Sequence, residues 1–411
     1  MNSPKLTVII PTRERADTLF HTLRTVLEQE YENLEIIVSD NASIDNTRQV
    51  VSQFTDVRLR YINTGNRIGM SENWEFALSH VTGDFVMFLG DDDGLLPHAC
   101  TDVASILNFT NAKALIWNKP NYNWPSISIS PNQITLQCSY DLCKLDGHVI
   151  LKGIASGRTS YGRLPVLYAG FVSMISINNI KARTGNFFHS ITPDVYSGIV
   201  LAEELKSYLY SFRPFSINAG SRHSNGIASV TDNIKAQRFY TENKLTINKN
   251  LPVIRGSIQS HVAESFLQAK DVHLLQKFHL NINRIHYNII CELRALDFNI
   301  QKEGLTKLLT LPLNSVNRKM VEKELKLIVN QTVHKEDIQK HDVSTPLNGH
   351  LHFNCDSLYI ENSYDASKLI GTIIGKYKIP DTIKEGSYFS FILIFIKRKL
   401  TSLLSKYLIP V

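Results

Sequence analysis

The sequence predicts an α/β fold: a doubly wound, mostly parallel sheet flanked by helices and followed by a mainly helical C-terminal region. Three features support this prediction. Short apolar, β-branched runs alternate with segments of helical periodicity over the first 120 residues. The most hydrophobic run, residues 85–89, is apolar at successive positions, which is typical of a strand covered on both faces. From residue 235 onward, apolar residues recur mainly at helical spacing.

The individual elements follow in chain order. A first strand is expected at 6–10, ending at Pro11, which cannot donate a ladder hydrogen bond. Asp17 is expected to cap a helix with apolar residues between positions 19 and 27. Further strands are expected at 35–38, 60–62 and 85–89, with helices at 50–54 and 74–81 between them, the latter ending at Gly83. Ligands of such sheets bind beyond the carboxyl ends of the strands, so the site should lie just after residues 10, 38 and 89.

The charge of the chain is distributed unevenly. The net charge is +6, yet residues 1–110 hold 8 Lys and Arg against 16 Asp and Glu, which makes this part −8 and the remainder +14. An acidic first part suits a bound cation, and a basic remainder suits an anionic substrate or surface. No basic strip with interleaved aromatic residues is present, so a nucleic-acid partner is disfavoured.

The sequence gives no indication of export. The first apolar run, residues 6–10, is shorter than the about 7–15 residues of a secretory signal, and no stretch reaches the roughly 20 apolar residues of a spanning helix. The five cysteines are scattered without C-x-x-C spacing, which favours reduced thiols. A cytoplasmic protein is therefore expected.

Three adjacent aspartates, Asp91, Asp92 and Asp93, directly follow the 85–89 strand. At a separation of ~4 Å, each pair of like charges costs on the order of 4 kcal/mol at an effective dielectric constant near 20. A divalent cation relieves this repulsion, and carboxylate oxygens suit Mg²⁺ or Mn²⁺. A solvated acidic turn is the alternative, which the position directly behind a strand disfavours.

A second polar segment follows the 35–38 strand. A carboxylate at Asp40 can accept the N3–H of uracil or thymine, and guanine also offers donors. Asn41, Ser43 and Asp45 can equally serve as turn and helix-capping residues. A role in nucleotide binding is therefore favoured for Asp40, and a local structural role for Asn41, Ser43 and Asp45.

Four segments together resemble family 2 glycosyltransferases in order and spacing: VIIPTRER at 8–15, EIIVSDNASIDNT at 35–47, NRIG at 66–69 and FLGDDD at 88–93. The resemblance covers residues 5–105, about a quarter of the chain. It implies a GT-A fold, inverting chemistry and a nucleotide-sugar donor, with UDP as the favoured nucleotide. It also implies a bound Mn²⁺ or Mg²⁺.

The resemblance also implies roles for individual residues. Asp40 would contact the nucleobase. Asp91 and Asp92 would lie near the ribose and the diphosphate. The metal would bind Asp93 together with Asp91. The other residues expected to bind the nucleotide are Pro11, Thr12, Arg15, Asn41 and Arg67.

Inverting transfer also needs a base that takes the proton of the attacking hydroxyl. In the family this carboxylate lies roughly 100 residues beyond the acidic cluster, and the segment 190–197 of this chain resembles the one that carries it. Asp194 is therefore the predicted base, with Glu203 and Glu204 as rivals; capping of a 195–205 helix is the structural alternative. Arg222 and His223 lie in a polar loop that could hold the diphosphate or could be plain surface.

We expect four segments. Residues 1–110 would form the nucleotide-sugar-binding half, 111–230 the acceptor-binding half, 231–385 a helical region, and 386–411 an apolar and basic helix. In this last segment, the apolar run 388–396 is followed by three basic residues at 397–399. Such a helix could lie on an anionic membrane or pack against protein. Membrane contact would suit a lipid-linked saccharide acceptor, and a position at the inner face of the cell membrane.

The sequence disfavours two other function classes, a nucleotidyltransferase and a non-catalytic scaffold. A sugar-1-phosphate nucleotidyltransferase normally carries a glycine-rich loop after the first strand, whereas residues 11–15 contain no glycine. A non-catalytic nucleotide-binding scaffold is disfavoured by the intact Asp40 and by the three aspartates at 91–93.

Overall fold

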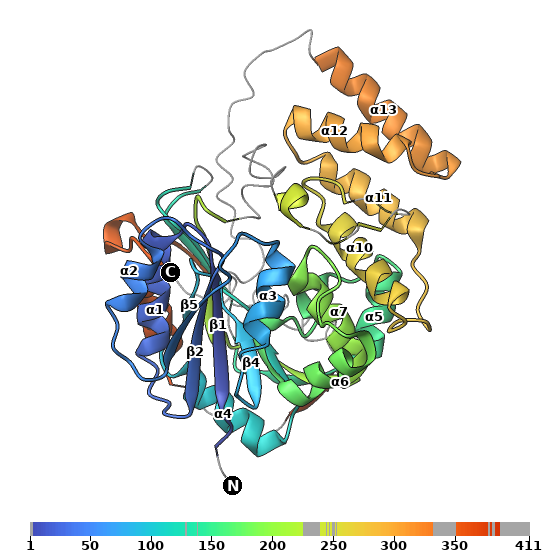
Figure 1. Ribbon diagram of the computed structural model, residues 1–411. Helices are drawn as coiled ribbons and strands as arrows, with labels where there is room; N and C mark the ends of the chain where they lie inside the picture. Colours follow the sequence, from blue (N-terminus) through green and yellow to red (C-terminus); the bar gives the residue numbers. More distant parts are fainter. Residues whose placement is uncertain are drawn as a thin grey trace, which may run out of the picture.

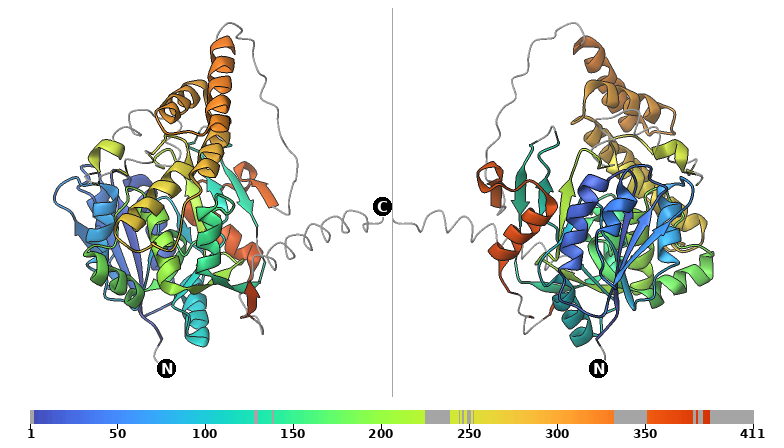
Figure 2. Two further views of the ribbon diagram at one scale, coloured as in Figure 1. Left: turned by 90° about the vertical axis from the view of Figure 1, so that its right-hand side faces the viewer. Right: turned by 60° about the vertical axis from the view of Figure 1, so that its left-hand side comes forward.

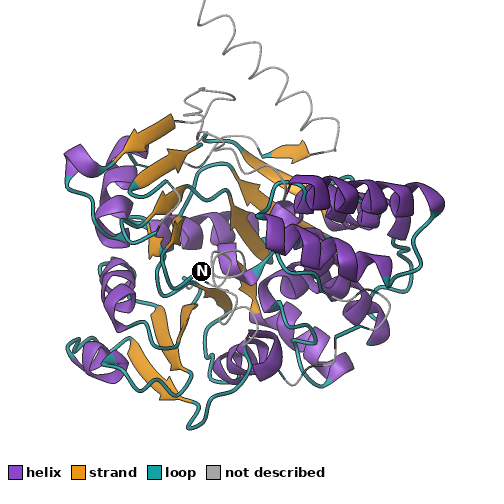
Figure 3. Cartoon of the chain, turned by 90° about the horizontal axis from the view of Figure 1, so that it is seen from above, coloured by secondary structure: helices purple, strands orange, loops and turns teal. Residues whose placement is uncertain are grey.

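The computed structural model describes residues 3–127, 130–137, 139–224, 239–243, 245, 247–248, 251, 253–331, 351–376, 379 and 383–386. Within these residues the strands form a nine-stranded sheet and a smaller five-stranded sheet (Figure 1). Seen from above, helices lie on both sides of the strands (Figure 3). Helices α10 to α13 extend beyond this body as a helical layer of their own (Figure 2).

The larger sheet has the order β14-β9-β11-β6-β10-β4-β1-β2-β3. Five of its eight neighbouring pairs are parallel, so the predicted mostly parallel sheet with flanking helices is confirmed. Its strands are β1 (Leu6–Thr12), β2 (Leu34–Asp40), β3 (Leu59–Asn63), β4 (Phe85–Phe88), β6 (Ala114–Trp117), β9 (Leu142–Asp146), β10 (Gly170–Ser173), β11 (Ser207–Ser211) and β14 (Lys384–Gly386).

The smaller sheet has the order β13-β8-β7-β12-β5. Its strand β5 directly follows the three aspartates, and β12 pairs with it in antiparallel fashion, so this sheet is joined to the end of β4. Its strands are β5 (Gly94–Leu95), β7 (Asn121–Asn123), β8 (Gln133–Leu136), β12 (Ser216–Gly220) and β13 (Leu351–Asn354).

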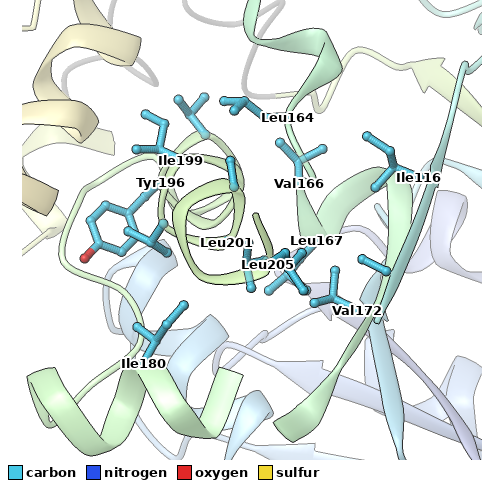
Figure 4. Packing of buried hydrophobic residues seen from close by; sticks show 14 of the residues in the cluster. Ile116, Leu164, Val166, Leu167, Val172, Ile180, Tyr196, Ile199, Leu201 and Leu205 are labelled. Carbon is cyan, nitrogen blue, oxygen red and sulfur yellow. The ribbon is translucent and has the colours of Figure 1, made fainter. Parts of the chain in front are cut away.

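Successive residues of the central strands face opposite cores. On β1, Ile9 belongs to one buried cluster, whereas Val8 and Ile10 belong to the other. This alternation is what period-2 side-chain geometry requires of a strand with helices on both faces. Figure 4 shows part of the first cluster, in which apolar residues surround helix α7.

The helices divide between these two cores. Buried residues of α3, α5, α6, α7 and α10 contribute to the first cluster, and those of α1 and α4 to the second. The helices are α1 (Ala16–Leu27), α2 (Thr47–Ser52), α3 (Met70–Leu78), α4 (Ala99–Thr110), α5 (Gly147–Ala155), α6 (Met174–Thr184), α7 (Pro193–Leu205), α10 (Ile258–Asp271), α11 (Ile282–Leu293), α12 (Phe298–Leu309), α13 (Ser315–Gln331) and α14 (Ser363–Ile374).

The predicted helical C-terminal region is confirmed by α10 to α13, which share a core of their own. Residues 351–386, which we assigned to the same region, instead include strands of both sheets. Strand β13 pairs with β8, and β14 pairs with β9. The buried Arg213 fastens this returning segment by donating to the carbonyl oxygens of Ile374 and Gly375, at 3.1 and 2.7 Å.

Three local predictions were wrong. Strand β1 continues through Pro11 to Thr12, because β2 pairs with both residues and the N–H of Asn41 donates to the carbonyl of Thr12. Helix α1 begins at Ala16, so Asp17 lies in its first turn instead of capping it. Helix α3 ends at Leu78, before the expected end near Gly83.

The segment 386–411 was predicted to be an apolar and basic helix, and its run 388–399 lies outside the described residues. None of the described helices combines the length and the hydropathy needed to cross a bilayer. Among the described residues, Cys100, Cys143 and Cys355 are buried and Cys291 is partly buried.

Gly147 brings the start of α5 into close contact with the backbone near the end of α7. A Cβ atom at this position would lie 2.1 Å from the carbonyl oxygen of Ala202. Gly147→Ala should therefore lower the free energy of unfolding by about 1–3 kcal/mol, since the backbone must shift to accept the methyl group.

Urea denaturation followed by circular dichroism measures this effect. Gly162→Ala is the matched control, because the nearest atom to its added Cβ would be 3.7 Å away. The control should change the free energy of unfolding by less than about 0.5 kcal/mol. Equal stability of the two variants would contradict the close packing of α5 on α7.

Candidate active site

A pocket of about 650 Å³ opens at the carboxyl ends of β1 and β4. This is where the α/β fold predicts a ligand site. The predicted residues that line it are Pro11, Thr12, Arg15, Asn41, Asp91, Asp92 and Asp194. The structure thus brings the loop after β1, the acidic triplet and the start of α7 into one cavity.

Asp91 is neutralised by Arg15. The Arg15 guanidinium donates to Asp91 Oδ1 at 2.7 Å, and it also donates to the backbone carbonyl of His223. Asp91 is 1% exposed, and burial raises the pKa of its carboxyl group while the Arg15 charge opposes that shift. Arg15 therefore ties the loop after β1 to the acidic triplet and to the segment that follows β12.

Asp92 is held by hydroxyl groups. Ser221 and Ser224 both donate to Asp92 Oδ2 at 2.6 Å. The indole N–H of Trp124 donates to the Asp92 backbone carbonyl at 3.0 Å. Sequence reasoning missed these partners because they lie more than thirty positions away along the chain, in loops without a motif of their own.

Asp93 is buried and is not among the residues that line the pocket. Its Oδ1 accepts the backbone N–H of Ala219 at 2.6 Å, and Oδ2 accepts that of Gly90 at 3.2 Å. Burial and then the neighbouring Asp92 charge raise the pKa of Asp93 to about 7, against the effects of Lys119 and of a Tyr168 hydrogen bond.

The glycine before the triplet is required by this packing. A Cβ at Gly90 would lie 2.3 Å from the Tyr168 hydroxyl oxygen and 2.8 Å from Asp93 Oδ2. Real Cβ atoms do not approach other atoms so closely, so a side chain at this position would displace Tyr168 or the Asp93 carboxylate.

Lys119 and Tyr168 are two members of the site that the sequence analysis missed. The Lys119 ammonium lies 4.5 Å from the centroid of the Tyr168 ring, and this ring stacks on Trp74. Burial lowers the pKa of Lys119, while Asp93 and Asp194 oppose that shift. A usable signal did exist for Lys119: it comes two residues after the end of β6, at the edge of the sheet where ligands bind.

Asp194 lies in the first turn of α7 and lines the pocket. Thr192 occupies the N-cap position, so Asp194 does not cap the helix. Burial raises the pKa of the Asp194 carboxyl group, whereas the Val195 backbone N–H and the charge of Lys119 act in the opposite direction.

The rival carboxylates lie near the other end of α7 and do not line the pocket. Glu203 is 2.8 Å from His148, and Glu204 pairs with Arg183 at 2.6 Å. Geometry therefore favours Asp194 over both.

Asp40 is placed differently from the pocket residues. It is buried, and its carboxylate accepts hydrogen bonds from the Ser43 backbone N–H at 3.0 Å, Tyr61 hydroxyl at 2.6 Å and Asn63 amide at 3.0 Å. The neighbouring Asn41 does line the pocket. Its side-chain amide donates to the carbonyl oxygen of Ile68 and accepts the backbone N–H of the same residue.

Three other predicted residues lie outside the pocket lining. Arg67 forms an ion pair with Glu14, while Arg222 and His223 contact Asp17 at 3.2 and 3.3 Å. Arg222 is largely exposed. A contact of these side chains with a diphosphate stays a prediction.

The opposite wall of the pocket comes from the region that the sequence left without a function. Residues 239–243 and the first turns of α10 face the acidic triplet and the start of α7. Glu242 reaches across to Arg13, in the loop after β1, at 2.5 Å. The lining residues of this wall are Phe239, Tyr240, Glu242, Asn243, Gly256, Ser257, Ile258 and His261.

Asp91 and Asp93 are the predicted metal ligands. Within the described residues, no three His, Cys, Asp or Glu side chains form a group that could enclose a metal by themselves. Asp91 Oδ2 is buried and has no well-formed hydrogen bond there. One free, buried carboxylate oxygen beside Asp92 fits a cation whose remaining ligands come from a bound diphosphate and water, which is a common arrangement for Mg²⁺.

Comparison with known proteins extends the resemblance. Residues 7–160 match the family described as Glycosyl transferase family 2. Over 108 residues the chain is 39% identical to the Campylobacter jejuni GalNAc(5)-diNAcBac-PP-undecaprenol beta-1,3-glucosyltransferase, covering 26% of this chain and 35% of that protein. It is 28% identical over 138 residues to the Escherichia coli UDP-Glc:alpha-D-GlcNAc-diphosphoundecaprenol beta-1,3-glucosyltransferase WfgD, covering 33% and 54% of the two chains.

The similarity to both relatives thus spans between about a third and a half of their length. Among solved structures, S. aureus TarS 1–349 in complex with UDP-GlcNAc aligns with 82% of this chain and 95% of its own, with 13% identity and a TM-score of 0.44. The family match, the four motifs and their position at the ends of β1, β2 and β4 agree with one another. Residues 7–160 therefore resemble glycosyl transferase family 2 in sequence, in motif order and in the position of the motifs.

Proposed function

We propose that this protein is an inverting glycosyltransferase that moves a sugar from a nucleotide diphosphate donor, with UDP as the favoured nucleotide, to a hydroxyl group of a saccharide acceptor. The observation that carries the proposal is that Arg15, Asp91 and Asp92 line the same pocket as the carboxylate of Asp194. The resemblance of residues 7–160 to the family supports the same chemistry.

The donor would bind on the side of β1 and β4. Arg15 has a cationic guanidinium near the position expected for the diphosphate, and Pro11, Thr12 and Asn41 line the adjoining surface. The Asp40 carboxylate already accepts three protein hydrogen bonds, so its first role is to shape the loop beside the nucleotide base. Direct contact between Asp40 and the base is an additional prediction.

Asp194 would act as the general base. The acceptor oxygen forms a new bond to the anomeric carbon as the bond from that carbon to the diphosphate breaks, and the hydroxyl proton moves to the Asp194 carboxylate. The diphosphate leaves with the bonding electrons. Burial makes the Asp194 carboxylate a stronger base than an exposed aspartate, which suits proton abstraction near neutral pH.

A divalent cation held by Asp91 and Asp93 would neutralise charge on the departing diphosphate. Asp91 supplies the free buried oxygen for this role. Asp93 holds the backbone of Ala219 and Gly90, so its carboxylate also keeps the end of β12 against the acidic triplet.

The acceptor is inferred to be a saccharide carried on a polyprenyl diphosphate, in polysaccharide or glycolipid assembly. The two relatives described above are named for acceptors linked to undecaprenol through a diphosphate. An acceptor of this kind lies in the membrane, so the enzyme would work in the cytoplasm at the inner face of the cell membrane. The basic part of the chain beyond residue 110 suits contact with anionic lipid.

Nucleotide binding and turnover test the proposal directly. Isothermal titration with UDP should show binding that tightens when Mn²⁺ is added, and a screen of nucleotide sugars with Mn²⁺ should identify one donor that the protein hydrolyses slowly. Binding of UDP with no transfer and no hydrolysis of any donor would favour the scaffold over the enzyme. Absence of UDP binding would contradict the proposal.

Asp194→Asn should lower kcat by about 10²–10⁴-fold, because the amide cannot accept the proton. UDP affinity should stay close to that of the parent protein. Glu203→Gln is the matched control, since Glu203 lies on the same helix but pairs with His148 away from the pocket lining. Asp194 has no role as the base if its variant turns over as fast as this control.

Lys119→Met should change the pH dependence of the reaction. The base must be ionised, so activity falls as the pH drops through the raised pKa of Asp194. Removing the positive charge of Lys119 raises that pKa further, so the acidic limb of the kcat/KM profile should move to higher pH by about one unit.

The exposed Lys113 provides the comparison, and Lys113→Met should leave the profile unchanged. At pH values well above the shifted limb, Lys119→Met should approach the activity of the parent protein. An acidic limb that does not move would contradict an effect of Lys119 on the pKa of Asp194.

A further inference from the structure

The pocket wall formed by residues 239–243 and the start of α10 contains a tyrosine and a histidine that contact each other. His261, in the first turns of α10, lies with its Nδ1 2.8 Å from the carbonyl oxygen of Ser257. Because a carbonyl oxygen only accepts, Nδ1 carries the proton and donates it, which leaves Nε2 as an acceptor. Ile258 and Phe239 are apolar neighbours in the same lining.

Tyr240 completes the pair. Its hydroxyl group lies 3.4 Å from His261 Nε2, and the two rings are 6.3 Å apart at an interplanar angle of 29°. Both side chains line the pocket. Nε2 has one lone pair, so a ligand hydroxyl group that donates to it replaces the 3.4 Å contact with Tyr240, whose hydroxyl group can then bond the ligand as well. The Tyr240 ring adds an aromatic face.

The imidazole of His261 is expected to be uncharged at neutral pH. Burial lowers the pKa of its imidazole, Ser257 opposes this, and the charge of Lys307 adds to the lowering. A neutral imidazole with its Nδ1–H fixed by the backbone is an acceptor of defined direction. It suits a hydroxyl donor better than an anion such as the donor diphosphate.

The wall is held at a set position relative to Asp194. The Ser190 hydroxyl donates to the buried Glu264 of α10 at 2.6 Å, and the hydroxyl groups of Thr192 and Ser265 are 2.9 Å apart. These contacts fasten α10 to the loop that leads into α7. Both contacts are buried hydrogen bonds, which are costly to break, so α10 is joined firmly to the loop before Asp194.

The two faces of the pocket thus differ in chemistry. The Arg15 side presents a cation and carboxylates. The α10 side presents aromatic rings, apolar groups and polar groups, and its Glu242 carboxylate is paired with Arg13. An acceptor that gives its proton to Asp194 must lie against the start of α7, and α10 is the element packed there. Sugars have apolar C–H faces and hydroxyl donors, which match this second surface.

Resting on the function proposed above, we propose that Tyr240 and His261 bind the saccharide acceptor. A sugar ring lies on the aromatic face of Tyr240, and one sugar hydroxyl group donates to His261 Nε2. The helical region that begins with α10 thereby supplies the acceptor subsite, and the α7–α10 contact sets that subsite relative to the base.

Binding measurements separate the acceptor from the donor. Saturation-transfer NMR with methyl glycosides of glucose, galactose and N-acetylglucosamine, in the presence of saturating UDP and Mn²⁺, should show binding of at least one glycoside to the parent protein. His261→Ala and Tyr240→Ala should each weaken that binding by about tenfold or more, whereas UDP affinity measured by isothermal titration should be unchanged.

Conservative variants separate recognition from folding. His261→Gln retains an acceptor and should recover part of the affinity, and Tyr240→Phe retains the ring and should lose less than Tyr240→Ala. The exposed His279 provides the control, and His279→Ala should bind as the parent protein does. Matching thermal unfolding curves establish that every variant is folded.

Four results would overturn the inference. A parallel loss of UDP affinity in the His261 and Tyr240 variants would place the pair in the donor site. Unchanged glycoside binding in both alanine variants, or no glycoside binding by a parent protein that does bind UDP, would refute the acceptor subsite and leave the proposed function standing. A parent protein that binds no UDP would overturn both.

Discussion

Three carboxylates are buried side by side at the end of β4, and the structure around them is arranged to satisfy each one. Asp91 has the Arg15 guanidinium, Asp92 has two serine hydroxyl groups, and Asp93 has two backbone N–H groups. Taking an unpaired carboxylate out of water costs several kcal/mol, so these partners are conditions of folding as well as features of the site. They come from the loop after β1, from β12 and from the segment after it. The acidic triplet therefore joins the larger sheet to the smaller one.

A consequence of this arrangement is that the part of the pocket at the ends of β1 and β4 is held by contacts within the protein. Arg15 is fixed between Asp91 and the His223 carbonyl, and a side chain at Gly90 would collide with Tyr168. Preorganised charges of this kind are effective because they need little rearrangement when charge develops in a reaction. The α10 side is built differently. Its one lining carboxylate, Glu242, is paired with Arg13, and α10 is fastened to the loop before α7 by buried hydroxyl groups and Glu264. The helical region is thus part of the site and not an appendage to the sheet.

Much of the pocket at the ends of β1 and β4 could be predicted from local sequence. The apolar run before Asp91 identifies a buried strand, and a carboxylate that directly follows such a strand must lie at the sheet edge where ligands bind. Pro11 and Thr12 end β1 and Arg15 follows it, so these residues lie at the same edge. The resemblance placed Arg67 with the nucleotide, and a polar loop suggested Arg222 and His223 for the diphosphate. In the structure these side chains contact Glu14 and Asp17 outside the pocket lining, and their contact with a nucleotide stays a prediction.

The sequence by itself determined the α/β class, the parallel arrangement of its first strands and the edge at which the acidic triplet lies. These properties depend on residue type and on spacings of a few positions, which is the range of hydrophobic periodicity and turn chemistry. Only the tertiary structure decided that Lys119 and Tyr168 stand beside Asp93 and that residues 239–243 and 256–261 contribute to the pocket lining. It also decided that β13 and β14 add to the two sheets. Those contacts join segments tens to hundreds of residues apart, and their partners are selected by shape and burial in the folded core, which no local pattern records.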